Sequence, residues 1–199
     1  VADSGAYRTP EHPQPDFRAR RAAALQAYWE NMPLRSAARP LGIDMQLFRR
    51  VDWGALASFH MLDTRQYRTD QPCDDGVKAP CEAVFDPNGT ILGEAQRKWL
   101  FDGLASSKAK WNVLAQQVMI AKVDLVGGAD VGYSMDKWSG YEVDRRRVLK
   151  FLHDRKIANP VVLTGDIHTN WANELVADFD QLDSAVVGAE FVGTSITSG

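Results

Sequence analysis

The chain has 199 residues, of which 45% are hydrophobic and 25% charged, a balance typical of one ordinary globular domain. Its formal net charge of −3 is spread over residues of both signs, so the chain has no basic footprint for nucleic acid. No apolar run approaches the roughly 18 residues that a membrane-spanning helix needs, which argues against an integral membrane protein.

The N-terminal residues 1–16 are polar and Pro-rich, and we expect an extended leader here rather than a signal peptide, which would carry an apolar core. From Phe17 to Met32 apolar residues recur at helical spacing, with Asp16 as the expected helix cap. Three arginines point away from this apolar stripe, and we interpret them as a solvated helix face rather than an anion site: Arg18, Arg20 and Arg21.

Two β-type runs at 47–51 and 58–62 follow, separated by a turn at 52–54, and they predict an antiparallel hairpin. His60 lies inside the second run and is expected to be a structural histidine. At the end of that run Arg65 offers a planar fork of donors that suits phosphate oxygens. The alternative is that Asp63 pairs with Arg65 or Arg68 and only fixes the next loop.

Residues 69–90 form a long loop rich in Asp, Pro and Gly that holds both cysteines, Cys73 and Cys81. Their short separation favours one disulfide, which would imply an oxidising compartment. Two unrelated thiols or half of a metal knuckle are the alternatives, although no further cysteine could complete a zinc cluster.

Helix and strand then alternate, as in an α/β layer. We predict a helix over 92–104 and a buried strand over 111–118, where Gln116 and Gln117 either reach a site or bond within the turn. A Gly-rich segment at 126–141 is expected to be a loop on the active side. Ser139 and Glu142 form a predicted capping box for the next helix, whose arginines 145–147 are assigned to a solvated face.

The stretch from Asn159 to Leu175 reads NPVVLTGDIHTNWANEL and organises the rest of the chain. Its apolar run, 161–163, predicts a fully buried parallel strand, and Gly165 is expected to let the backbone turn closely. Asp166 and His168 follow at the carboxyl end of this strand, where open α/β sheets bind ligands. An oxygen and a nitrogen donor two residues apart suit a metal. The alternative is a turn-capping Asp beside a His that bonds a carbonyl.

Further strands are predicted at 171–179 and 185–196, with a turn at 180–184. The stretch LTGDIHTNWANEL resembles the GD[VI]HxxW signature of the alkaline phosphatase D (PhoD) family of metallophosphoesterases. Four other blocks agree in order: RAAALQAYWENMPLR at 21–35, LDTRQYR at 62–68, KWNVLAQQV at 110–118 and EFVGTSITS at 190–198. The resemblance covers nearly the whole chain.

The resemblance implies an α/β fold, part of a two-sheet αββα sandwich of the metallophosphoesterase type, with residues 1–199 forming part of one domain. It implies hydrolysis of phosphate mono- or diesters of small substrates by a metal-activated hydroxide, with Asp166 and His168 as metal ligands and Arg65 as a substrate-binding catalytic residue. The metals it suggests are iron with calcium, with zinc or manganese possible, and the enzymes it points to are exported, secreted or periplasmic.

The family block that contains Glu190, Thr194 and Ser195 fits packing and turn hydrogen bonds at least as well as catalysis. Both ends of the chain look cut, so we expect a fragment whose remaining metal ligands lie upstream and which is inert or nearly so by itself. The alternatives are a non-catalytic domain that binds an anion in the same pocket and a metal-dependent hydrolase of non-phosphate esters.

Overall fold

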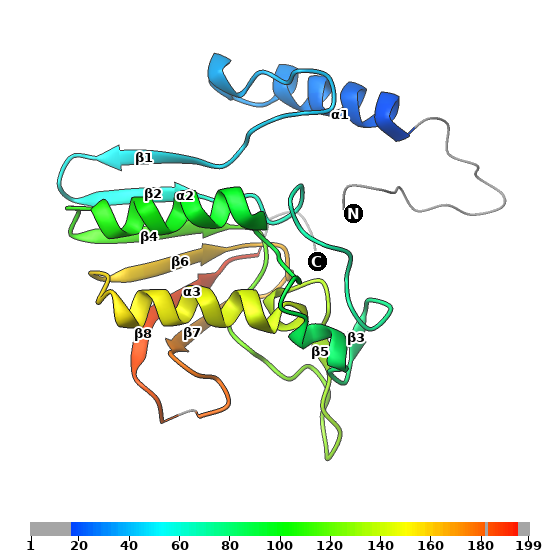
Figure 1. The fold of residues 1–199 in the computed structure, drawn as a ribbon, viewed down its shortest axis with the longest axis vertical. Helices are drawn as coiled ribbons and strands as arrows, with labels where there is room; N and C mark the ends of the chain where they lie inside the picture. Colours follow the sequence, from blue (N-terminus) through cyan, green and yellow to red (C-terminus); the bar gives the residue numbers. More distant parts are fainter. Residues whose placement is uncertain (1–16, 182, 195–199) are drawn as a thin grey trace, which may run out of the picture.

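A computed structural model describes residues 17–181 and 183–194, so the expected leader, the Asp16 cap and Ser195 lie outside the described residues. The main element is a six-stranded mixed sheet in the order β1-β2-β4-β6-β8-β7 (Figure 1). Its strands are β1 (Arg49–Trp53), β2 (Ala57–Met61), β4 (Trp111–Gln116), β6 (Pro160–Thr164), β7 (Trp171–Val176) and β8 (Val186–Val192). The four central strands run parallel, and β1 and β7 are antiparallel edges.

Two helices cover one face of this sheet, α2 (Gly93–Ser106) and α3 (Glu142–Asp154) (Figure 1). Each forms the crossover between two parallel strands, β2 to β4 and β4 to β6, which is the βαβ arrangement that the sequence predicts. The helices meet through Phe101 and Phe151, whose rings stack with centroids 4.1 Å apart. Leu100 of α2, Leu149 of α3 and Leu114 of β4 are fully buried.

The opposite face of the sheet is open in the part of the chain that the structure describes. Met61, Ala115, Leu163 and Phe191 lie side by side across β2, β4, β6 and β8, and Leu163 and Phe191 are 42% and 50% exposed. The expectation that β6 is fully buried is therefore wrong for its outer face. An uncovered apolar sheet face of this kind fits one layer of a two-sheet sandwich.

Helix α1 (Phe17–Asn31) lies toward the β1 end of the sheet (Figure 1) and carries no fully buried residue. Its predicted solvated arginine face needs one correction. The Arg21 guanidinium is half-buried and donates to the Ile43 carbonyl oxygen at 3.0 Å and to the Gln66 side-chain oxygen at 3.2 Å. These bonds tie α1 to the segment before β1 and to the loop that follows β2.

The predicted hairpin is confirmed, with β1 two residues later than expected and Trp53 paired with Ala57. His60 on β2 is buried, as its structural assignment requires. Burial, with a smaller contribution from the Arg50 guanidinium, lowers the pKa of His60 from 6.5 to about 4. The imidazole is therefore neutral near pH 7.

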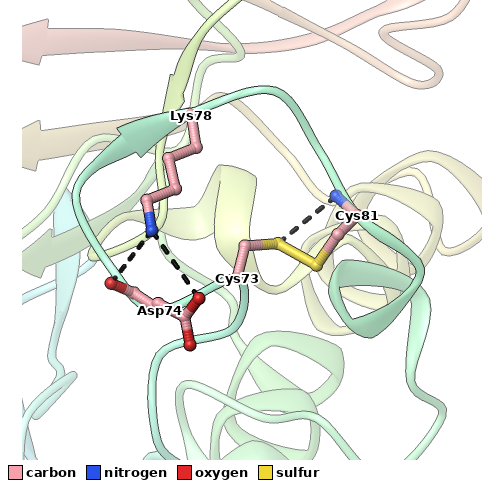
Figure 2. The surroundings of a disulfide bond; sticks show 4 residues. All are labelled: Cys73, Asp74, Lys78 and Cys81. Carbon is pink, nitrogen blue, oxygen red and sulfur yellow. Dashed lines mark hydrogen bonds and ion pairs between the residues drawn. A yellow bond between two sulfur atoms is a disulfide. The ribbon is translucent and has the colours of Figure 1, made fainter.

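The long loop contains the short strand β3 (Val77–Lys78), which pairs with β5 (Tyr133–Ser134), and a 3-10 turn at Glu82–Phe85. Another 3-10 turn, Ser36–Ala38, precedes β1. Cys73 and Cys81 form the favoured disulfide next to β3, and Lys78 contacts Asp74 across the loop (Figure 2). Cys73 and Asp74 both take left-handed backbone conformations, with φ of 57° and 58°. The disulfide thus closes a tightly turned loop.

Two expectations for α3 are wrong. The capping box does not form, because a 3-10 turn at Trp138–Gly140 precedes the helix and Tyr141 is its N-cap without a side-chain cap. The Glu142 carboxylate instead receives the Arg145 guanidinium at 2.5 Å. Arg145 is 1% exposed and lies under the Phe179 ring, 4.7 Å from its centroid, so it belongs to the interior rather than to a solvated face.

No helix in the described residues is both long and apolar enough to cross a membrane.

Candidate active site

The turn after β6 carries the two predicted metal ligands at the carboxyl edge of the sheet. Asp166 and His168 have left-handed backbones, with φ of 71° and 60°, and both are exposed. Gly165 does not take this conformation, and a Cβ built there would meet only the Gly193 carbonyl oxygen at 4.0 Å. The tight turn that was expected from Gly165 is therefore made by Asp166 and His168 themselves. Non-glycine residues held at positive φ are strained, and such strain clusters at functional sites.

Arg65 reaches this turn from the loop after β2, 101 residues away in sequence. Its Nη2 atom donates to the Asp166 Oδ2 atom at 3.1 Å, and its Nη1 atom donates to the Asp136 Oδ2 atom at 2.7 Å. The alternative pairing of Arg65 with Asp63 is wrong. The Asp63 carboxylate accepts the backbone N–H groups of Arg65 and Gln66 at 2.9 and 3.0 Å, which fixes the loop from which Arg65 extends.

Asp136 is the second carboxylate of the site, and it comes from the Gly-rich segment before α3. Its Oδ1 atom lies 2.8 Å from Nη1 of Arg68, whose side chain is 1% exposed, and accepts a hydrogen bond from Gln71 at 3.0 Å. Burial by itself would raise the pKa of Asp136, but the hydrogen bond and charge of Arg65, together with Arg68 and Gln71, lower it below its usual value. Asp136 is thus ionised at neutral pH.

Lys137 follows Asp136 and lies in the field of three carboxylates. Burial lowers the pKa of the Lys137 amine and outweighs the charges of Asp166, Asp136 and Glu190, which raise it. The site therefore combines two arginines with two partly exposed carboxylates, Arg65, Arg68, Asp136 and Asp166, and the Lys137 amine lies in the field of both carboxylates.

A buried network holds the end of β6 in place. The Glu190 carboxylate is fully buried and accepts hydrogen bonds from the Thr164 hydroxyl at 2.7 Å and from the amides of Ile120 and Ala121 at 2.8 and 2.9 Å. Thr164 also accepts the Gln116 amide at 2.8 Å. The last residue of β6, Thr164, is thereby anchored from both neighbouring strands, two residues before Asp166.

This network gives a structural role to residues that the sequence left open. Gln116 and Glu190 bond within the interior, and Gln117 accepts hydrogen bonds from the backbone amide and hydroxyl of Thr64 at 2.8 and 2.7 Å. The Thr194 amide donates to the Asn170 side chain at 3.1 Å, near the site turn. Among the described residues of this block, the structure therefore favours hydrogen bonding over catalysis.

Of the three predicted site residues, Arg65 and Asp166 are in direct contact, and His168 lies exposed in the same turn as Asp166. A carboxylate oxygen and an imidazole nitrogen on one exposed turn fit two ligands of a metal ion. Within 17–181 and 183–194, no three His, Cys, Asp or Glu side chains are grouped so that they could hold a metal. The described residues thus supply Asp166 and His168 as donors on this turn and no third donor grouped with them.

Sequence reasoning missed Asp136, Arg68 as its partner, and Lys137. The segment 126–141 was assigned to the active side, but its charged residues were not singled out. A usable signal existed, because Asp136 and Lys137 stand between Met135 and Trp138, both fully buried. Burying an unpaired charge is costly, so two charged residues between two core residues must each reach a polar partner or solvent.

The chain is similar to known phosphatases over nearly its whole length. A sequence model of PhoD-like phosphatases matches residues 3–199. Alkaline phosphatase D of Bacillus subtilis (strain 168) is 52% identical over 201 residues, which cover 100% of this chain and 34% of that protein. A solved structure of PhoD superposes with a TM-score of 0.88 and 54% identity over 92% of this chain and 35% of that one. The chain thus spans about a third of the length of these relatives.

Proposed function

The chain belongs to the PhoD-like phosphatase family, and from that premise we propose that it forms part of an enzyme that hydrolyses phosphate esters. The proposed substrates are small phosphate monoesters, diesters or both. Arg65 binds the phosphoryl group, and Asp166 with His168 holds a metal ion.

One observation carries this proposal, the contact between Arg65 and Asp166 at the carboxyl edge of the sheet. Both side chains are partly exposed, 35% for Arg65 and 48% for Asp166. An ion pair with this exposure contributes little to stability, at most about 1 kcal/mol. The guanidinium can therefore exchange a carboxylate oxygen for a phosphoryl oxygen at small cost, and its planar fork matches phosphate in geometry and charge.

The proposed metals are iron with calcium, with zinc or manganese as alternatives. A bound ion of this kind lowers the pKa of a coordinated water so that hydroxide is available at neutral pH. Because a water-activating site typically needs at least three protein ligands, we propose that the remaining ligands come from parts of the protein outside the described residues. By this reasoning the 199-residue chain alone is inert or nearly so.

The disulfide between Cys73 and Cys81 supports a place of action outside the reducing cytosol. We therefore propose that the enzyme is exported, either secreted or periplasmic.

The test compares this chain with a longer protein that contains it, on p-nitrophenyl phosphate and its bis ester, with added iron, calcium, manganese or zinc. We expect turnover only from the longer protein. In that protein Asp166→Asn should lose both bound metal and turnover, whereas Asp102→Asn, an exposed position on α2, should keep both. Full metal content and activity in Asp166→Asn would overturn the site, and comparable turnover by the 199-residue chain would refute its proposed inertness.

A further inference from the structure

The strongest unassigned feature is a linear chain of charges that ends at the proposed site. Asp136 divides its carboxylate between two arginines, with Oδ1 at 2.8 Å from Arg68 and Oδ2 at 2.7 Å from Arg65. The Arg65 guanidinium likewise contacts two carboxylates, with Nη1 at Asp136 and Nη2 at Asp166. The order of contacts is therefore Arg68, Asp136, Arg65, Asp166.

The inner end of this chain is buried and held by several contacts, whereas the outer end is exposed. The Arg68 side chain is 1% exposed, and its Nη1 atom also donates to the Asp136 backbone carbonyl oxygen at 3.3 Å. Gln71 adds a hydrogen bond to the same Asp136 oxygen that Arg68 holds. Exposure then rises from 29% at Asp136 to 48% at Asp166. The contact of Arg65 with Asp136 is thus the shorter and less exposed of its two.

From this asymmetry we infer that Asp136 is a positioning residue, which holds one half of the Arg65 guanidinium so that the other half faces the phosphoryl group. The inference rests on the proposed function of Arg65. When the Asp166 carboxylate binds another partner, Arg65 stays bound to Asp136 through Nη1, and Nη2 becomes available to donate to the phosphoryl group. Fixing a flexible side chain before the ligand arrives removes an ordering cost from binding.

The choice of variant follows from the contacts. Asp136→Ala would leave the buried Arg68 cation without its carboxylate, and the protein would be destabilised for that reason alone. Asp136→Asn keeps an oxygen for Arg68 and Gln71 but turns an NH2 group toward the Arg65 donors, so it breaks the one contact in question. Asp124→Asn is the matched control, since Asp124 lies in the same connection between β4 and α3 and accepts hydrogen bonds from the amides of Val126 and Gly132.

The experiment uses the longer, metal-loaded protein and measures the binding of inorganic phosphate by calorimetry, together with metal content and the thermal unfolding midpoint. Loss of a hydrogen bond between charged groups predicts about a 10- to 100-fold weaker phosphate affinity in Asp136→Asn, with metal content unchanged. Arg65→Ala should lose a similar factor. The double variant should be no weaker than Arg65→Ala alone, because Asp136 acts through Arg65.

The outcomes separate the two proposals. Unchanged phosphate affinity in Arg65→Ala would overturn the assignment of Arg65 and this inference with it. A weakened Arg65→Ala beside an unchanged Asp136→Asn, or a double variant whose loss is the product of the single losses, would overturn the inference alone. If Asp136→Asn unfolds, Gln71→Ala takes its place. It should weaken phosphate binding by about 2- to 5-fold through the same oxygen of Asp136, and an unchanged affinity would count against the inference.

Discussion

Replacement of Glu190 by Gln should destabilise the chain far more than its small chemical change suggests. The two oxygens of Glu190 accept from four donors. Oε1 receives the Ile120 amide and the Thr164 hydroxyl, and Oε2 receives the Ala121 amide and, at 3.3 Å, the Asn173 side chain. A carboxylate can accept all four hydrogen bonds because neither of its oxygens carries a hydrogen.

A glutamine has one oxygen, so either orientation points its NH2 group at a backbone amide. Ile120 and Ala121 are 1% and 3% exposed, and no solvent can replace the lost acceptor. One buried unpaired N–H costs about 1–3 kcal/mol, and the surviving bonds lose their charge-assisted strength. We therefore expect a loss of about 2–4 kcal/mol in the free energy of unfolding.

Urea unfolding followed by tryptophan fluorescence measures this loss as a lower midpoint with an unchanged slope. Glu174→Gln is the matched control, because Glu174 is exposed on the neighbouring strand β7, and it should change stability by less than about 0.5 kcal/mol. Hydrogen exchange of the Ile120 and Ala121 amides should accelerate only in Glu190→Gln. If the two variants were equally stable, the Glu190 oxygens could not be holding these amides in the way described.

Three further predictions concern other parts of the fold. The double variant Cys73→Ser, Cys81→Ser should lose about 2–3 kcal/mol from loop closure, and titration of two free thiols in denatured, non-reduced protein would contradict the disulfide. Between pH 6.5 and about 4 the unfolded state binds a proton at His60 that the folded state does not. The free energy of unfolding should therefore fall on acidification by up to about 1.4 kcal/mol per pH unit. His60→Gln should reduce this slope, and an identical slope would refute the lowered pKa of His60. Gly103→Ala should destabilise the fold, because the new Cβ would lie 3.0 Å from the buried His60 ring. Helix propensity alone would favour alanine by about 1 kcal/mol. A higher unfolding midpoint would show that the His60 ring can move aside.

The elements of the fold could be predicted because their signals are local. Helical spacing located α2 and α3, and short apolar runs bounded by turn residues located β4 and β6. The contact between Arg65 and Asp166 was also within reach, since the two follow β2 and β6, parallel strands whose carboxyl ends share one edge of the sheet.

The errors arise where a distant partner decides the outcome. Arg145 was assigned to solvent because it stands in a run of three arginines, yet it shares helical spacing with Val148, Leu149 and Leu152, and its partner Phe179 lies beyond β7. This spacing indicates a buried position, but the charge of arginine led to the opposite assignment. The exposure of Leu163 had no signal at all, because its sequence context is that of a buried strand, whereas the described residues leave that face of the sheet uncovered at Leu163.

The role of Asp136 could not be predicted for a related reason. Its three partners, Arg65, Arg68 and Gln71, are 65 to 71 residues away, and nothing local specifies how the Gly-rich segment reaches them. The pairing of β3 with β5 brings the two segments together, and strand pairs of two residues leave almost no pattern in a sequence.

The disulfide also determines what a protease could do to this loop. Every residue from Asp74 to Pro80 is exposed, so the ring is an accessible place for a cut. Because Cys73 and Cys81 bracket these residues, a cut between them leaves the two pieces covalently joined (Figure 2). Gln71, two residues before the ring, would keep its place beside Asp136. Trypsin cleavage after Lys78 should therefore appear as two fragments on a gel only after reduction.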